Sequence, residues 1–122
     1  MKKKVLVTDD DLGIRKFYEI ELKREGYDVI LASNAQEALA SMKDDQPDLV
    51  IMDIRMPGMD GVQTMELMLE ENNELPVIIN SAYSSYKDNY MSWSADAYLV
   101  KSSDTTELKS TVRSLLERSV VL

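Results

Sequence analysis

The chain contains neither cysteine nor histidine among its 122 residues. The absence of cysteine excludes disulfide bonds and thiolate metal sites. The absence of histidine excludes a phosphohistidine carrier, a hydrolase that depends on a histidine base, and a zinc enzyme with histidine ligands. The chemistry of this chain must therefore be sought in other side chains.

Long apolar runs are also missing, since none approaches the roughly 20 residues of a membrane-spanning helix. The basic start, Met1-Lys2-Lys3-Lys4, is followed by an apolar stretch that stops at Thr8, which is too short for a signal peptide. The formal net charge of −8 argues against sequence-independent binding of nucleic acid. We therefore expect a cytoplasmic protein with no membrane segment and no direct nucleic-acid binding.

Strand-like and helix-like segments alternate along the whole chain, with no internal repeat and no linker-like stretch. This alternation predicts one α/β domain over residues 1–122, with a flavodoxin-like, doubly wound, five-stranded parallel sheet of order 2-1-3-4-5 and five helices. The expected strands are Lys4–Thr8, Tyr27–Ala32, Asp48–Met52, a strand from Pro76 to Ser81, and Ala97–Val100.

Capping and breaking residues mark the expected helices. Gly26 suits the left-handed position after the first helix, Asn34 with Glu37 three residues later predicts the start of the second, and Pro47 stops it. The five expected helices run from Asp11 to Gly26, from Asn34 to Pro47, from Gly61 to Asn73, over Ser85–Trp93, and from Asp104 to Arg118.

Four apolar runs each end in a polar residue suited to phosphoryl chemistry. These residues are Asp9-Asp10, Asp53, Ser81 and Lys101. In an open parallel sheet the carboxyl ends of the strands lie along one edge, where ligands bind. Three carboxylates, a hydroxyl and an ammonium gathered there predict a site for Mg²⁺ and a phosphoryl group.

Each of these residues also has a purely structural explanation. Asp10 and Asp11 could cap a helix, Ser81 could belong to a turn, and surface lysines such as Lys101 are commonly solvated. The agreement of four strand ends favours a shared site over four separate structural roles.

The motifs Val7-Thr8-Asp9-Asp10-Asp11, Met52-Asp53 through Gly61, Asn80-Ser81-Ala82 and Tyr98-Leu99-Val100-Lys101 together resemble those of a response regulator receiver domain of bacterial two-component phosphorelay signalling, similar to the chemotaxis regulators. The resemblance covers essentially the whole chain. It implies a phosphoacceptor that is a signalling domain rather than a conventional enzyme, and that assists its own phosphorylation and slow dephosphorylation.

The resemblance assigns roles to the acids. Asp53 would take a phosphoryl group from a phosphohistidine, which requires it to lie beside its acidic neighbours and open to attack. Asp10, Asp53 and the backbone carbonyl of Arg55 would hold Mg²⁺, with Mn²⁺ as a substitute. Asp9 would act on the metal through water.

The resemblance also implies a switch. Lys101 would pair with one phosphoryl oxygen and Ser81 would donate to another, while Tyr98 turns inward. The face formed by the helix over 85–93, the strand Ala97–Val100 and the last helix would bind an output protein or domain. The expected partners are a sensor histidine kinase or phosphotransfer protein and that output partner, and the expected state is a monomer or a phosphorylation-dependent dimer.

Several residues depart from the family pattern or stand out within it. Ser102 follows Lys101 where proline in a cis bond is usual, so the Lys101–Ser102 bond is either trans with a reshaped loop or cis under strain. Tyr86, Tyr90 and Trp93 share a helical face, either as core aromatics or as a partner-binding patch. Tyr83 and Arg55 flank the expected phosphoryl position and could set the phosphate lifetime.

Two other functions remain open on the sequence. A magnesium-dependent phosphatase with an aspartate nucleophile would need a threonine in the motif after the first strand, which Asp9-Asp10-Asp11-Leu12-Gly13 lacks. A receiver-like binding module would no longer accept phosphate. The chain is either a stand-alone receiver or the N-terminal domain of a larger regulator, and the sequence does not name its kinase, output partner or pathway.

Overall fold

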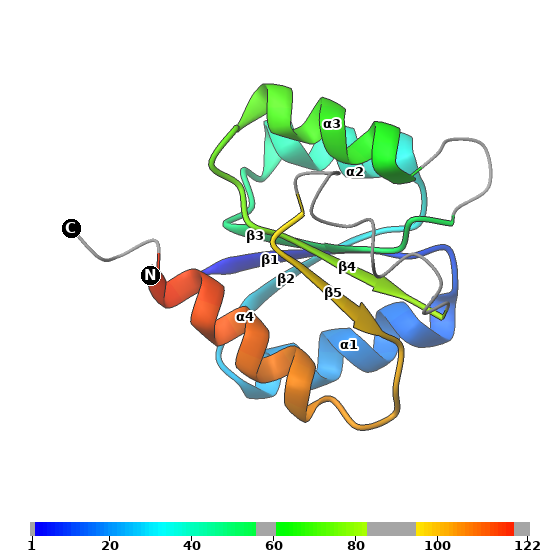
Figure 1. Cartoon of the computed structure of the whole chain (residues 1–122), viewed down its shortest axis with the longest axis vertical. Coiled ribbons are helices and arrows are strands. Elements are labelled where there is room, and N and C mark those ends of the chain that lie inside the picture. The colour runs from blue at the N-terminus through cyan, green and yellow to red at the C-terminus, as the bar shows by residue number, and fades with distance from the viewer. Residues whose placement is uncertain (1, 56–60, 83–94, 119–122) are drawn as a thin grey trace.

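The computed structural model describes residues 2–55, 61–82 and 95–118, which form a parallel sheet between two layers of helices (Figure 1). The strands follow the order β2-β1-β3-β4-β5, as predicted. The strands are β1 (Lys4–Thr8), β2 (Asp28–Ala32), β3 (Leu49–Met52), β4 (Val77–Ser81) and β5 (Ala97–Val100).

Four helices lie within the described residues. They are α1 (Leu12–Arg24), α2 (Ala35–Asp44), α3 (Gly61–Glu71) and α4 (Thr106–Arg118). Figure 1 shows α2 and α3 on one face of the sheet and α1 and α4 on the other. The fifth expected helix, over Ser85–Trp93, lies outside the described residues, as do Tyr83 and the aromatic face of Tyr86, Tyr90 and Trp93.

The helix ends follow the capping residues. The Asp11 carboxylate accepts a hydrogen bond from Ile14 N at 3.2 Å, and α1 is followed by Gly26, whose φ of 95° is left-handed. Asn34 Oδ1 accepts from Glu37 N at 2.8 Å, and Glu37 Oε1 in turn accepts from Ser33 N at 2.6 Å. The Asn34–Glu37 pair therefore caps α2 as the sequence predicts.

The last helix begins two residues later than expected. Asp104 Oδ1 accepts from the backbone N–H of Thr106 at 2.9 Å, which is a turn rather than a helical contact. The first helical bond instead runs from Lys109 N to Thr105 O at 2.9 Å. Asp104 thus precedes α4 and does not cap it.

Two apolar clusters fill the space on either side of the sheet. Leu6, Val50, Met52 and Ile79 face α2 and α3, where they meet residues such as Met65. The alternate strand residues pack on α1 and α4. They include Val5, Val7, Ile51, Ile78 and Leu99. The β3 strand is buried along its whole length, as a central parallel strand should be.

Strand register brings the predicted polar residues to one edge. Thr8 pairs with Met52, and Asp53 N donates to Thr8 O at 3.1 Å. Ser81 pairs with Val100, and Lys101 N donates to Ser81 O at 2.8 Å. The residues that follow β1, β3 and β5 therefore begin from neighbouring positions at the carboxyl edge.

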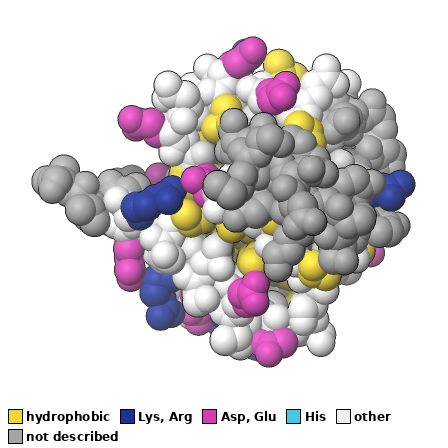
Figure 2. Space-filling view, viewed as in Figure 1, with side chains coloured by type: hydrophobic (Ala, Val, Ile, Leu, Met, Phe, Trp, Pro, Cys, Tyr) yellow, Lys and Arg dark blue, Asp and Glu magenta, His cyan; other side chains and the backbone are white. Residues whose placement is uncertain are grey.

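Charged side chains lie around much of the described surface, and acidic groups are prominent in the view of Figure 2, in keeping with the net charge of −8.

The acidic side chain of Glu21 links α1 to the start of α4. Glu21 of α1 accepts hydrogen bonds through Oε1 from Lys109 Nζ at 2.8 Å and from Thr105 Oγ1 at 3.0 Å. The Lys109 and Thr105 bonds lower the pKa of Glu21 from its ordinary value of 4.5.

Replacing Glu21 with glutamine should destabilise the fold at pH 7 and flatten its acid dependence. Because the pKa of Glu21 is lower in the folded state, its contribution is present above about pH 4.5 and is lost as the pH falls through the folded value. Urea unfolding at a series of pH values measures this, and the difference between wild type and Glu21→Gln should shrink in acid.

The matched control is Glu19→Gln, because Glu19 forms its ion pair within the same helix, with Lys23 one turn away at 3.1 Å. It should change the free energy of unfolding less than Glu21→Gln does. Equal effects of the two substitutions at every pH would contradict a stabilising link between α1 and α4.

Candidate functional site

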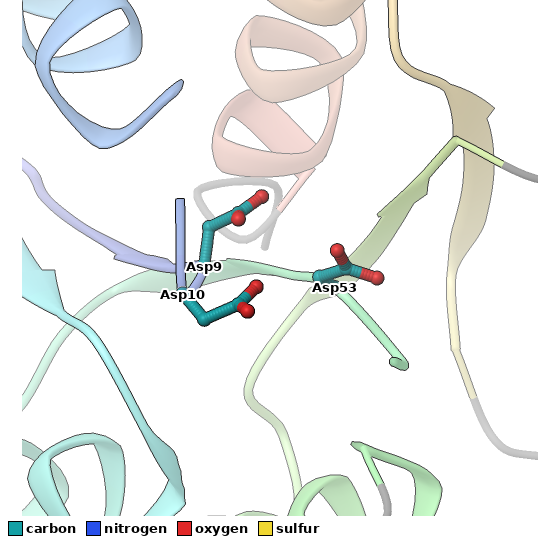
Figure 3. A group of neighbouring side chains, drawn as sticks. All are labelled: Asp9, Asp10 and Asp53. Atoms are coloured by element: carbon teal, nitrogen blue, oxygen red, sulfur yellow. The ribbon is translucent and has the colours of Figure 1, made fainter. Parts of the chain in front are cut away.

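Three carboxylates meet at the carboxyl edge of the sheet. Asp9 and Asp10 follow β1 and Asp53 follows β3, and one carboxylate oxygen of each lies within 4.8 Å of the others. Figure 3 shows the side chains of Asp9 and Asp10 extending toward the side on which Asp53 lies. Asp9 and Asp53 are buried and Asp10 is exposed. The sequence prediction that these acids are neighbours is thus met by their geometry.

Local hydrogen bonds hold the two acidic loops in place. Asp9 Oδ1 accepts from Asp11 N at 2.9 Å, and Asp53 Oδ1 accepts from Arg55 N at 3.0 Å, so each carboxylate closes a turn on its own backbone. Arg15 of α1 donates from its guanidinium to the carbonyl of Asp9 at 2.6 Å. These backbone hydrogen bonds to Oδ1 therefore fix the orientation of the Asp9 and Asp53 carboxylates. The Oδ2 atom of each is left for other partners.

Lys101 pairs with both of these second oxygens. It follows β5, and its ammonium lies 2.8 Å from Asp9 Oδ2 and 2.7 Å from Asp53 Oδ2. Its side chain is only 15% exposed. The resemblance implies that Lys101 pairs with a phosphoryl oxygen. In the structure it pairs with two of the acids and relieves their mutual repulsion.

Burial and charge act in opposite directions on these groups. Burial raises the pKa of Asp9, and this outweighs the hydrogen bond from Lys101, which lowers it. For Lys101, burial lowers the pKa, but the hydrogen bonds and charges of Asp53 and Asp9 together raise it above its ordinary value. The ammonium is therefore strongly held in its charged form.

The resemblance requires Asp53 to be open to attack, but the structure shows its side chain buried. The residue is 7% exposed, because one oxygen accepts from the Arg55 backbone and the other contacts Lys101. Its acidic neighbours are placed as expected. Access to its reactive oxygen depends on where the Lys101 ammonium lies.

The two switch residues are both buried. Ser81 ends β4 with no exposed surface, and Tyr98 in β5 is packed in the cluster that faces α2 and α3. Tyr98 therefore already lies inward, in the position that the resemblance assigned to the phosphorylated state.

The Lys101–Ser102 bond is trans, because no peptide bond in the described ranges is cis. Ser102 instead shapes the loop after β5, where its hydroxyl accepts a hydrogen bond from Asp104 N at 3.1 Å. Of the two alternatives that the sequence left open, the trans bond is the one found, and Lys101 still reaches Asp9 and Asp53.

Oxygen ligands of this kind suit Mg²⁺, which prefers carboxylates, carbonyls and water. The donor set of Asp9, Asp10 and Asp53 therefore fits the expected metal in its chemistry.

Among the described helices, none has the length and apolar character needed to span a membrane.

Sequence reasoning gave no role to two buried polar residues beside the site. Tyr18 of α1 donates to Asn80 Oδ1 of β4 at 2.5 Å. The signal was present as an asparagine within the apolar run Val77-Ile78-Ile79-Asn80, a residue that is costly to bury without a partner. Its partner could not be identified from sequence.

Comparisons with known proteins agree on one family. The model of the family described as "Response regulator receiver domain" matches residues 5–113. A probable transcriptional regulator, ycf27 of Porphyridium aerugineum, is 38% identical over 96% of this chain and 49% of its own length. The chain spans about half the length of the curated relatives that it matches.

Solved structures give the same result. The response regulator protein TrrA of Thermotoga maritima, in complex with Mg²⁺-BeF, is 40% identical, covers 93% of this chain and 98% of its own, and superposes with a TM-score of 0.87. TrrA in complex with the histidine kinase ThkA is likewise 40% identical over 93% of this chain and 98% of its own, with a TM-score of 0.85. Family match, sequence identity and fold together show that the chain belongs to the response regulator receiver domain family, whose members are signalling domains.

Proposed function

We propose that this chain accepts a phosphoryl group on Asp53 from the phosphohistidine of a sensor histidine kinase or phosphotransfer protein. The observation that carries the proposal is the single ammonium of Lys101 held between Asp9 and Asp53, at the edge where three carboxylates meet. The structures of TrrA with Mg²⁺-BeF and with a histidine kinase support the extension to this chain at 40% identity.

Asp10, Asp53 and the backbone carbonyl of Arg55 would hold Mg²⁺ or Mn²⁺, with Asp9 acting through water. The bound metal would neutralise carboxylate charge and bind oxygens of the transferring group. Like charges about 4 Å apart repel by roughly 4 kcal/mol at an effective dielectric near 20, so this neutralisation matters for a dianionic donor.

The transfer itself needs only one nucleophile. An Asp53 carboxylate oxygen attacks phosphorus, the P–N bond to the donor imidazole breaks, and the imidazole leaves with its electron pair and takes up a proton. The product is an acyl phosphate on Asp53. Later attack by water on that phosphorus returns Asp53 and phosphate, so the domain assists both steps without becoming a general phosphatase.

Lys101 then has a second position. Before transfer it covers the Oδ2 of Asp53 at 2.7 Å. As the donor's phosphoryl group enters the site, the ammonium shifts from Asp53 Oδ2 to a phosphoryl oxygen, and it keeps Asp9 as its other partner before and after transfer. Because the Lys101 ammonium exchanges one anion for another, its charge stays paired throughout. The exchange also exposes the Asp53 oxygen that must attack.

Ser81 and Tyr98 would relay the change. The Ser81 hydroxyl donates to another phosphoryl oxygen, and the buried Tyr98 behind it stabilises the state that binds an output protein or domain. Within the described residues, the proposed binding face comprises β5 and α4. Phosphorylation and partner binding on that face must then favour each other equally.

The same proposal treats residues 1–122 as a single domain that acts in the cytoplasm as a monomer or as a phosphorylation-dependent dimer. One observation favours a second function, a receiver-like binding module that takes no phosphate, because Asp53 is only 7% exposed. Phosphorylation with acetyl phosphate distinguishes the two functions.

Incubation with acetyl phosphate and Mg²⁺, followed by intact mass, should add one phosphoryl group to the wild-type chain. Asp53→Asn should show none, because the amide is not a nucleophile, and excess chelator should abolish the adduct on wild type. Asp28→Asn is the matched control, since Asp28 lies at the opposite edge of the sheet. A wild-type chain that stays unmodified would favour the binding module.

Replacing Ser81 with alanine should leave Asp53 able to accept phosphate but weaken the switch. One charge-assisted hydrogen bond is worth about 1.5–3 kcal/mol, so the ratio of switched to unswitched population should fall by about tenfold or more. Backbone NMR shifts in β5 and α4 on adding Mg²⁺ and beryllofluoride measure that population.

Ser41→Ala, a buried serine of α2, is the control and should leave those shifts unchanged. Shifts in Ser81→Ala as large as in wild type would show that the hydroxyl does not couple the site to β5 and α4.

A further inference from the structure

A buried pair of polar side chains lies on the same side of the sheet as α1 and α4. Tyr18 and Asn80 are each 3% exposed, and the Tyr18 hydroxyl donates to Asn80 Oδ1 at 2.5 Å. Asn80 belongs to β4, which is buried along its whole length, and its side chain takes the face shared with Ile78. An apolar residue at either position would fill this space without any demand for a partner.

The pair connects three elements at the point where Lys101 leaves the sheet. Asn80 Nδ2 donates to the carbonyl of Leu99 in β5 at 3.3 Å, two residues before Lys101. Lys101 N in turn donates to the carbonyl of Ser81, the residue after Asn80. A continuous path of hydrogen bonds therefore runs from α1 through β4 to the backbone that carries Lys101.

The Tyr18 hydroxyl also lies within electrostatic reach of the acids. Burial is the main cause that raises the pKa of Tyr18, and the charges of Lys101, Asp9 and Asp53 act on it as well. The pair thus lies near the charged group, on the side of the sheet that α1 and α4 cover. Buried, fully satisfied polar pairs of this kind fix relative positions more sharply than apolar packing does.

We propose that Tyr18 and Asn80 are positioning residues that hold Lys101 where its ammonium can reach both Asp9 and Asp53. The inference rests on the proposed phosphoacceptor function and adds to it two residues outside the charged group. Neither touches the transferring phosphoryl group. They act through Lys101, and their effect on phosphorylation must vanish when Lys101 is removed.

The competing explanation is that the pair only stabilises the core. The two explanations differ for the double variant Tyr18→Phe/Asn80→Leu. Tyr18→Phe alone leaves the Asn80 oxygen buried without its donor, which is destabilising, whereas replacing both partners with apolar groups of similar size can be nearly neutral. The double variant should regain most of the stability lost by Tyr18→Phe but not its phosphorylation rate.

The experiment measures the rate of adduct formation from acetyl phosphate and Mg²⁺ by intact mass, and the stability by urea unfolding. Tyr18→Phe and the double variant should each slow the reaction on the order of tenfold, the size expected for a misplaced charged group. In a Lys101→Ala background the same substitutions should change the rate by less than about twofold. Tyr27→Phe, the same deletion of a hydroxyl beside the start of β2, should leave the rate unchanged.

A readout without phosphate completes the test. With lysine labelled at Cε, the signal of Lys101 should move in Tyr18→Phe and in the double variant, and not in Tyr27→Phe. A double variant that recovers the wild-type rate, or a Tyr18→Phe effect that persists in the Lys101→Ala background, would overturn the positioning role. A wild-type chain that takes no phosphate at all would instead overturn the proposed function, and the positioning role with it.

Discussion

The ion pairs of Lys101 with Asp9 and Asp53, at 2.8 and 2.7 Å, are the interaction on which the site depends. Carboxylates collected at one edge of a sheet repel one another, and two of these are buried, which adds a desolvation cost. A single ammonium placed between them offsets both effects. Breaking the arrangement is costly, so under the proposed function the lysine would leave Asp53 only for another anion, such as a phosphoryl oxygen.

The sheet makes this arrangement possible because its register is fixed by burial. A one-residue slip of β1 or β3 would turn apolar side chains out of two filled clusters, so Asp9 and Asp53 cannot drift apart. The position of Lys101 has less support from the same source. The loop after β5 is exposed at Ser102 and Ser103, and the bond after Lys101 is trans. Contacts made by core residues near Lys101 therefore become more important for holding its side chain in place.

These facts explain which features of the structure could be predicted from the sequence and which could not. The fully apolar β3, the capping pair Asn34 and Glu37, and the left-handed Gly26 report local preferences, so the strand order and most helix ends were predictable. The meeting of Asp9, Asp10 and Asp53 followed from the topology. The pairing of Lys101 with two acids and the low exposure of Asp53 did not, because they depend on distances between loops. The partner of Asn80 lies 62 positions away in sequence, and no local pattern connects the two.

The buried Tyr98 adds a constraint on the switch. It is packed inward in the same structure in which Lys101 pairs with both Asp9 and Asp53. If inward and outward positions of Tyr98 interconvert before phosphorylation, the phosphoryl group selects between them rather than creating one. The energy for that selection must then come from contacts that differ between the two states at Ser81 and Lys101. Under the proposed function, the exchange of Lys101 from Asp53 to the phosphoryl group would both expose the nucleophile and bias the output face.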